Sequence, residues 1–171
     1  MFFSISDMQQ GRVSFNEAFA PGVIEFTDQQ LQQTEPIVAS GAAELLEATL
    51  EVSVSGHLAT RMEAACDRCL EPTAFPIEAD FKLLYRPAAL SPERGEVLIE
   101  DSEAEVGFYE GEGLELGDVL REEILLLLPM QRVCHEECKG ICPVCGQNRN
   151  QAACQCHQEP GDDRWSGLRN L

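Results

Sequence analysis

The sequence predicts an α+β fold: an antiparallel β meander of three or more strands, covered by a leucine-rich helix and followed by a small cysteine-rich C-terminal segment. Three observations support this class. Apolar and polar residues alternate between Leu46 and Leu83, an apolar helical stripe runs from Leu116 to Leu128, and eight cysteines form tight groups. We therefore expect a β-rich body with its covering helix over residues 1–130 and a cysteine-rich tail over residues 131–171.

Three runs in the middle of the chain have the period of two that is typical of half-buried strands. They cover residues 46–55, 58–65 and 74–83. Gly56 separates the first two runs and predicts a turn or bulge there. Pro76 confines the last strand to a sheet edge or a bulge, because proline has no N–H group to donate to a neighbouring strand.

The other parts of the body give weaker patterns. The first forty residues are polar and rich in Gln, and predict only a loose strand or extended arm. Residues 86–113 form an acidic connection that we expect to be partly mobile, with one short strand at 96–100. The predicted helix has Asp118 as its N-cap and ends at Pro129. Its leucines should cover the meander, at about 1.5–3 kcal/mol for each buried side chain.

The cysteines all occur in closely spaced pairs. Two pairs have the spacing C-x2-C, one C-x3-C and one C-x-C; in chain order they are Cys66 and Cys69, Cys134 and Cys138, Cys142 and Cys145, and Cys154 and Cys156. Such spacings bring two thiolates to one ion from a single turn of backbone. Eight cysteines make two tetrahedral four-thiolate sites, so we expect all eight to hold two structural zinc ions.

The grouping of the four pairs is open. In one scheme the last two pairs form a local knuckle, and the first two form a long-range site that pins the strand hairpin to the exit of the helix. In the other scheme the second and third pairs form the local site, and the last pair meets the first. We prefer the first scheme because the short loop between Cys145 and Cys154 closes at low entropic cost. His135 or His157 is an alternative ligand to a neighbouring thiolate.

The tail contains too little apolar material to fold by burial alone. Between Cys134 and Cys156 the branched aliphatic residues are Ile141 and Val144. Zinc would supply the missing free energy, about 10–16 kcal/mol for a small structural site. Beyond the cysteines, we expect Trp165 to pack a short terminal helix onto the body.

Other chemistries fit this sequence less well. The start of the chain lacks the basic and apolar regions of a signal peptide, and no apolar run is long enough to span a membrane. We therefore expect a cytoplasmic protein whose cysteines stay reduced rather than form disulfides. Ferredoxin spacings are absent, as are the motifs of zinc proteases, P-loop enzymes, dinucleotide-binding folds and serine hydrolases. We expect no enzymatic activity, no small-molecule substrate and no membrane association.

The formal net charge is −18, from 30 acidic and 12 basic residues. Such a surface repels phosphate backbones and attracts basic partners. The tail is the exception, with five basic and five acidic residues after residue 130. Any contact with RNA should therefore involve the tail, through Arg132, Lys139 and Arg149.

Several motifs occur together and in a fixed order. They are the Cys66–Pro72 stretch CDRCLEP, the leucine-rich Glu122–Pro129 stretch, the Cys138–Gly146 stretch CKGICPVCG, Asn148, Asn150, the Cys154/Cys156 pair and the closing Asp163–Trp165. From about Leu46 to the C-terminus, this arrangement resembles the YceD family, the large ribosomal RNA subunit accumulation proteins of bacteria and plastids.

The resemblance implies a role in the synthesis, processing or stability of large-subunit ribosomal RNA, without known catalysis. It also implies a ribosomal protein or a pre-ribosomal large-subunit particle as partner. Together with the charge, this favours an acidic adaptor for a basic ribosomal protein. The alternatives are a ribosomal-RNA-binding zinc protein acting through its tail and a zinc-stapled interaction domain with an unrelated partner.

Overall fold

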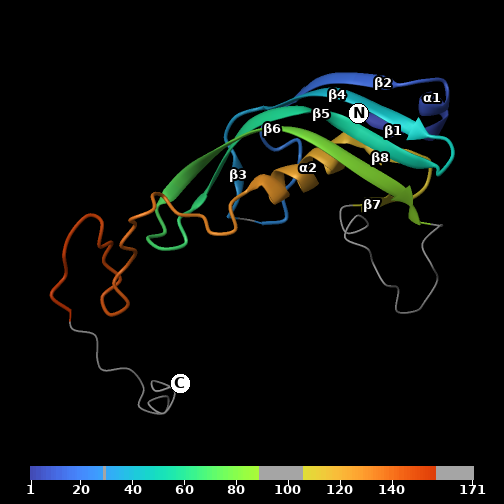
Figure 1. The fold of residues 1–171 in the computed structure, drawn as a ribbon. Coiled ribbons are helices and arrows are strands. Elements are labelled where there is room, and N and C mark those ends of the chain that lie inside the picture. Colours follow the sequence, from blue (N-terminus) through green and yellow to red (C-terminus); the bar gives the residue numbers. More distant parts are fainter. Residues whose placement is uncertain (29, 89–105, 157–171) are drawn as a thin grey trace, which may run out of the picture. The chain divides into compact units, whose positions relative to one another are not determined.

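The fold is built on a curved six-stranded sheet with the strand order β2-β4-β5-β6-β7, in which β3 also pairs with β5 (Figure 1). The computed structural model describes residues 1–28, 30–88 and 106–156. The sheet strands are β2 (Val13–Phe19), β3 (Gln32–Gln33), β4 (Ile37–Leu46), β5 (Glu51–Ala65), β6 (Pro72–Pro87) and β7 (Val106–Tyr109). A second, two-stranded sheet and two helices complete the fold: β1 (Phe2–Ser4) with β8 (Gly113–Glu115), α1 (Ile5–Gln9) and α2 (Leu116–Leu127). The predicted α+β class is confirmed.

The chain forms two compact units. The sheet unit comprises residues 1–64 and 74–130, and the cysteine unit comprises residues 65–73 and 131–171. The turn between β5 and β6 thus belongs with the C-terminal residues rather than with the sheet. No helix in the described part of the chain is long and apolar enough to cross a membrane.

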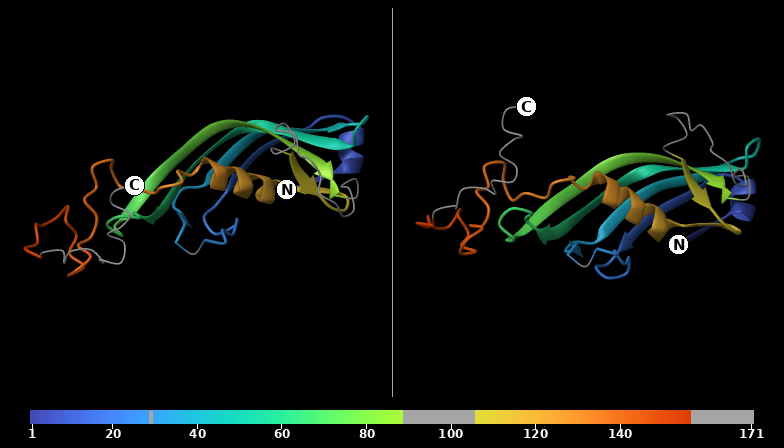
Figure 2. Two further views of the ribbon diagram at one scale, coloured as in Figure 1. Left: turned by 60° about the horizontal axis from the view of Figure 1, so that its bottom comes forward. Right: turned by 90° about the horizontal axis from the view of Figure 1, so that it is seen from below.

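The core of the sheet unit lies between the sheet and α2. Figure 2 shows α2 lying along the concave side of the curved sheet. The helix buries Leu116, Val119, Leu120 and Ile124. They join one cluster with apolar residues of β5, namely Val52, Val54, Leu58 and Met62. The alternation read from the sequence therefore marks the buried face of β5.

The turn predicted at Gly56 is wrong. Gly56 lies inside β5, directly opposite Gly41 of β4. A Cβ atom at Gly41 or Gly56 would lie 2.8 or 3.2 Å from Cζ of Phe15. The Cβ atom would lie closer still to a carbonyl oxygen of the partner strand, that of Ser55 or Ser40, so the two glycines allow both the close approach of β4 and β5 and the packing of the Phe15 ring. The chain turns instead at Leu50, whose φ is 56°.

The N-terminal residues, for which the sequence predicts a loose strand or extended arm, contain a strand that is firmly part of the sheet. Strand β2 pairs with β4 from Val13 to Phe19, and the rings of Phe3 and Phe15 meet in the core with their centroids 5.6 Å apart. Of the seven residues of β2, only Phe15 is fully buried. A strand with one buried residue gives no clear alternation of apolar and polar residues in the sequence. Its partner strand supplies most of its stabilising contacts.

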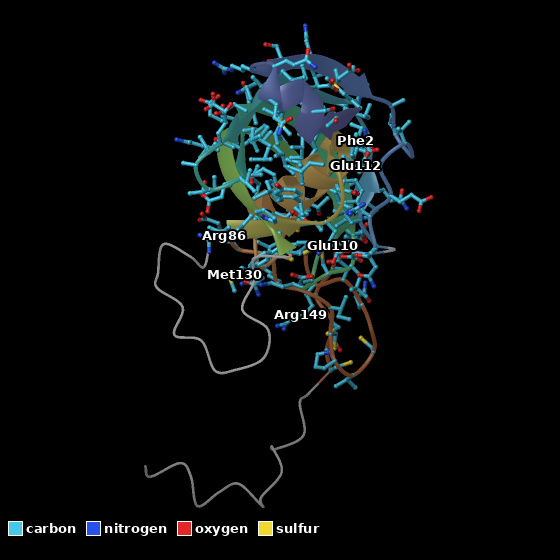
Figure 3. All side chains as sticks on the ribbon, turned by 90° about the vertical axis from the view of Figure 1, so that its right-hand side faces the viewer. Phe2, Arg86, Glu110, Glu112, Met130 and Arg149 are labelled. Carbon is cyan, nitrogen blue, oxygen red and sulfur yellow. The ribbon has the colours of Figure 1, made fainter. Side chains whose placement is uncertain are left out.

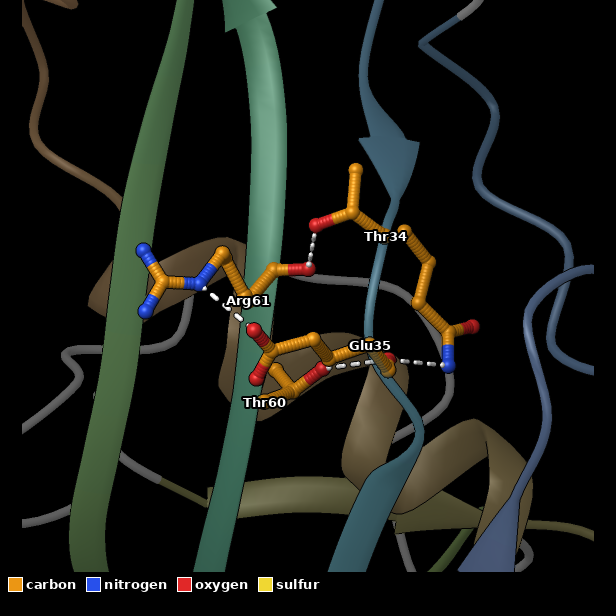
Figure 4. A network of polar contacts seen from close by, with 5 residues as sticks. Thr34, Glu35, Thr60 and Arg61 are labelled. Atoms are coloured by element: carbon orange, nitrogen blue, oxygen red, sulfur yellow. Dashed lines mark hydrogen bonds and ion pairs between the residues drawn. The ribbon is translucent and has the colours of Figure 1, made fainter.

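The connection before β4 is fastened to β5 by polar contacts (Figure 4). The Thr34 hydroxyl donates to the Arg61 carbonyl at 3.0 Å, and the Arg61 guanidinium pairs with the Glu35 carboxylate at 2.8 Å. The Glu35 carbonyl accepts hydrogen bonds from the Thr60 hydroxyl and from the Gln33 amide, at 3.1 and 2.9 Å. These contacts hold a segment with little apolar content against the sheet.

The remaining sequence predictions for the body have mixed outcomes. Helix α2 begins after Glu115 rather than Asp118, which instead pairs with Arg121 one turn later, at 2.8 Å. Pro76 fits the predicted edge position, because within the described residues β6 pairs with β7 only over Leu84–Pro87. The strand expected at 96–100 lies outside the described residues.

Helix α2 offers a matched pair of leucines for testing the core. Leu120 is fully buried, whereas Leu126 is 76% exposed. We expect Leu120→Ala to lower the free energy of unfolding by about 2–5 kcal/mol, because it leaves a cavity against the sheet. Leu126→Ala should change it by less than about 0.5 kcal/mol. Urea unfolding followed by circular dichroism measures both, and equal effects would contradict the position of α2.

Candidate metal centres

The turn between β5 and β6 presents the first cysteine pair. The Cys66 N–H donates to the Glu71 carbonyl at 2.9 Å, and the Leu70 N–H donates to the Cys66 carbonyl at 2.8 Å. Leu70 has φ of 62° and is 62% exposed. The left-handed conformation at Leu70 reverses the chain and places the Cys66 and Cys69 side chains on one side of the turn.

These two cysteines meet the second pair in what we call the inner site, formed by Cys66, Cys69, Cys134 and Cys138. The four sulfur atoms all lie within 4.8 Å of one another. The Cys66 and Cys138 sulfurs are 3.9 Å apart, and those of Cys69 and Cys134 are 3.7 Å apart. A tetrahedral zinc site with Zn–S bonds of about 2.3 Å requires sulfur separations of about 3.8 Å. The geometry therefore fits a four-thiolate metal site.

The other four cysteines form the outer site: Cys142, Cys145, Cys154 and Cys156. Their sulfur atoms also lie within 4.8 Å of one another. A short hairpin supports them, in which the Cys142 N–H donates to the Gln147 carbonyl and the Arg149 N–H to the Gly140 carbonyl, at 2.8 and 2.9 Å. Ile141 and Asn148 face each other across this hairpin.

The structure thus groups the cysteines as in the preferred of the two schemes. His135 is not among either group of four, although its Nδ1 atom lies 3.1 Å from the Cys134 sulfur. His157 and Trp165, with the expected terminal helix, lie outside the described residues.

The two sites differ in burial. At the inner site Cys66, Cys69 and Cys138 are at most 5% exposed. At the outer site Cys142 is buried, whereas Cys145 and Cys156 are exposed. Four sulfur ligands fill a tetrahedral coordination shell, so neither set leaves an open position for a substrate. Both donor sets suit a structural metal.

Backbone donors favour the thiolate form at the inner site. Burial opposes ionisation of the Cys66 thiol, but backbone hydrogen bonds outweigh it and lower its pKa to about 6. The donors are the N–H groups of Cys69, Arg68 and Cys134. Burial and the neighbouring thiols raise the pKa of Cys134 to about 12. A divalent cation between the sulfurs would offset this cost by stabilising all four thiolates.

The outer site likewise combines one thiol whose pKa is lowered with one whose pKa is raised. The backbone N–H groups of Cys145 and Val144 lower the pKa of Cys142 to about 6. The neighbouring Cys145 thiol and burial raise the pKa of Cys156 to about 12. Here too, a cation at the centre of the four sulfurs would stabilise a set of thiolates that repel one another.

Arg68 connects the inner site to the backbone around it. Its guanidinium donates to the carbonyls of Glu136 and Cys138, at 3.1 and 3.2 Å. Its own carbonyl accepts the Ile141 N–H at 2.9 Å. A positive charge at this position helps to balance a thiolate-rich centre.

The three basic residues considered for RNA contact are divided by the structure. Lys139 and Arg149 line one groove of about 520 Å³ beside the outer site, together with Pro143 and Val144. Arg149 is labelled in Figure 3, where sulfur atoms are yellow. Arg132 is not a residue of this groove; its N–H group donates to the Asp67 carboxylate at 2.7 Å.

Sequence reasoning singled out Asn148 and Asn150 only as part of a motif and missed the contacts by which polar side chains support the cysteines. Asn150 donates from Nδ2 to the Cys138 sulfur at 3.2 Å, and its Oδ1 atom accepts the Lys139 N–H at 2.8 Å. Glu71 accepts hydrogen bonds from Asn148 and Gln151. The local signal is the concentration of Asn and Gln in the loop between Cys145 and Cys154, since such side chains satisfy backbone and thiolate groups in tight turns.

The C-terminal part of the chain matches a known protein family. Residues 54–171 match the family model described as large ribosomal RNA subunit accumulation protein YceD. The chain belongs to the YceD family. The match includes both cysteine sites, α2, and all of β6 to β8. No solved structure matches the chain.

Curated relatives come from bacteria and plants. An uncharacterized protein of Mycobacterium tuberculosis is 30% identical over 118 residues, which cover 68% of this chain and 54% of the relative. The chloroplastic YCED homolog 1 of Arabidopsis thaliana is 23% identical over 142 residues, covering 71% and 44%. The maize protein of the same name is 25% identical over 126 residues, covering 60% and 43%. The chain spans about half the length of the curated relatives it matches.

Gly140 tests the local fold of the cysteine unit. Its φ is 69°, and a Cβ atom there would lie 2.9 Å from the Arg68 carbonyl oxygen. We expect Gly140→Ala to destabilise the cysteine unit by about 1–3 kcal/mol, through backbone strain and loss of the Ile141–Arg68 hydrogen bond. Amide hydrogen exchange of Ile141 and Arg149 measures this. Gly111→Ala, at a similar φ of 71° in the sheet unit, is the control and should leave those amides unchanged.

Proposed function

We propose that this protein is a non-enzymatic ribosome-biogenesis factor that supports the accumulation of large-subunit ribosomal RNA. In this proposal it is an acidic adaptor for a basic ribosomal protein or a pre-ribosomal particle, and it works in the cytoplasm. The observation that carries the proposal is the YceD family match over residues 54–171. The plant relatives that match the chain have large ribosomal RNA subunit accumulation in their names.

The charge supports an adaptor for a basic protein. The chain has a formal net charge of −18. Exposed carboxylates are spread over the sheet unit, including Glu110 and Glu112, which Figure 3 labels. A surface of this sign attracts basic protein segments and repels bare RNA.

Two structural zinc ions are the second part of the proposal. The inner site would be held by Cys66, Cys69, Cys134 and Cys138, and the outer site by Cys142, Cys145, Cys154 and Cys156. The sulfur separations and the all-cysteine donor sets, of which the inner one is mostly buried, support this assignment. The ions would replace the hydrophobic core that the cysteine unit lacks and so give its surface a fixed shape.

Metal analysis tests the zinc sites. Protein purified under reducing conditions should contain two zinc ions per chain. Cys69→Ser and Cys145→Ser should each lower the content to one, because each removes one ligand from a different site. A strong chelator should unfold the cysteine unit while the amides of β4 and β5 stay protected from exchange. A metal-free preparation, or disulfides among the eight cysteines, would contradict the assignment.

The cellular role is tested by deleting the gene and measuring the two ribosomal RNAs. We expect less large-subunit RNA relative to small-subunit RNA, restored by the intact gene. Leu120→Ala, which destabilises the sheet unit, should restore the ratio poorly. The control Leu126→Ala should restore it as the intact gene does. An unchanged ratio after deletion would refute the role in RNA accumulation.

The adaptor mechanism has a separate test. Capture of the tagged protein from a low-salt extract should recover a basic ribosomal protein. Raising the salt should release it, because added ions screen attraction between exposed charges. Recovery of ribosomal RNA without any ribosomal protein would reject the adaptor and leave the RNA role standing.

The groove lined by Lys139 and Arg149 favours a second candidate, direct RNA binding by the cysteine unit. A filled four-thiolate zinc site carries a net charge of −2, so these two cations also balance the outer site. Replacing Arg132, Lys139 and Arg149 together by Ala should lower RNA affinity. The replacement should also reduce the dependence of log K on log salt by roughly 0.7 for each lost phosphate contact. Unchanged binding in a filter assay would exclude this candidate.

A further inference from the structure

The loop of the outer site reaches the inner site through one side chain. This loop runs from Gly146 to Ala153, between the second and third outer cysteines. Asn150, near its middle, donates from Nδ2 to the sulfur of Cys138, an inner-site cysteine that is 5% exposed. The N···S distance is 3.2 Å. An amide that donates to a thiolate stabilises its negative charge.

The position of Asn150 is set by two further hydrogen bonds. Its Oδ1 atom accepts the N–H of Lys139, the residue that follows Cys138, at 2.8 Å. Its own N–H donates to Oδ1 of Asn148 at 2.9 Å. The amide group is therefore oriented with its oxygen toward the backbone and its nitrogen toward the sulfur.

Glu71 forms a second link between the same two parts. Its backbone carbonyl accepts the N–H of Cys66, an inner-site cysteine. Its side-chain Oε1 accepts Nδ2 of Asn148 at 3.2 Å and Nε2 of Gln151 at 3.0 Å. One residue of the turn thus holds the inner site by its backbone and the outer loop by its side chain.

Apolar contacts contribute little to the outer loop, which is otherwise held by the backbone hydrogen bonds of its hairpin. Val144 beside it is 61% exposed, and Ile141 is 37% exposed. A metal at the outer site would close the loop by joining Cys145 to Cys154 and would so fix Asn150 against the inner site. Without that closure the loop keeps only its hairpin and side-chain hydrogen bonds, because apolar burial does not replace the metal.

We propose that Asn150 is a positioning residue for the inner site, and that it makes the two sites cooperative: an ion at the outer site orders the loop and tightens metal binding at the inner site. Coupling between two binding sites is reciprocal, so an inner ion tightens the outer site by the same factor. Hydrogen bonds to metal ligands are typically worth about 10–100-fold in metal affinity. Because Asn150 is a single exposed amide, we expect its removal to lower the metal affinity of the inner site about 10-fold. The inference rests on the proposal that both sites bind metal.

The experiment uses the full chain loaded with cadmium-113, whose nuclear resonance reports each site separately. Increasing chelator then measures the affinity of each site. The variant Cys154→Ser/Cys156→Ser retains only the inner site, so the resonance that it keeps is assigned to that site. This variant should lose its inner ion at an about 10-fold lower chelator concentration than the intact chain does.

Three single substitutions define the role of Asn150. Asn150→Ala should weaken the inner site about 10-fold. Asn150→Asp keeps the oxygen that accepts the Lys139 N–H but places a negative charge beside the Cys138 sulfur, and should weaken the inner site at least as much. Gln147→Ala changes an exposed side chain of the same loop and should have no effect. Wild-type inner affinity in the Asp variant would reduce Asn150 to a turn-forming role and overturn the proposal.

A double-mutant cycle tests the coupling itself. In the Cys154→Ser/Cys156→Ser background, Asn150→Ala should have no further effect, because the loop that carries Asn150 is no longer closed. An equal loss of inner affinity in both backgrounds would overturn the coupling. The absence of both cadmium resonances would instead refute the metal sites on which it rests. Two resonances with affinities that no variant changes would refute the coupling alone.

Discussion

The cysteine unit depends on four sulfur atoms that two distant segments of the chain bring together. Cys66 and Cys69 come from the turn between β5 and β6, and Cys134 and Cys138 follow α2 by a few residues. Thiols this close repel one another once ionised, and backbone N–H groups stabilise only part of the set. A cation at the centre of the four sulfurs, as proposed above, would neutralise this charge. The closely specified turns of the segment, with Gly140 and Leu70 in left-handed conformations, accompany this gathering of the sulfurs.

The sheet unit has a different basis for its stability. Its core is apolar, with α2 on the concave face of the sheet and the rings of Phe3 and Phe15 packed together within the core. The two units are joined covalently where the chain leaves β5, enters β6 and leaves α2. Burial stabilises one unit, and the proposed ions stabilise the other, so loss of metal need not unfold the sheet.

The supporting residues of the cysteine unit link the two sites by side-chain contacts as well as through the chain. Only three residues separate Cys138 from Cys142, and Asn150 and Glu71 add side-chain contacts across the same boundary. Ligands, turns and polar side chains therefore act together as one folded element. In the proposed function, such an element presents a defined surface to a ribosomal partner, whereas catalysis would require an open metal position that four thiolates do not leave.

The sequence by itself determined the fold class, the buried face of β5 and the pairing of closely spaced cysteines, because these follow from periodicity and from ligand reach within a single turn. It did not predict the place of the N-terminal residues, since a strand such as β2 with one buried residue takes its stability from its partner β4. It also misread Gly56 as a turn or bulge, because the reason for that glycine is the close approach of the β4 backbone, together with the Phe15 ring, from remote strands. The short loop between Cys145 and Cys154 favoured the observed grouping of the cysteines, but only the tertiary structure decided between the two schemes and placed Asn150 against Cys138. The inner site depends on the distance between segments that lie far apart in sequence, such as Cys66 and Cys138, and local patterns do not determine that distance.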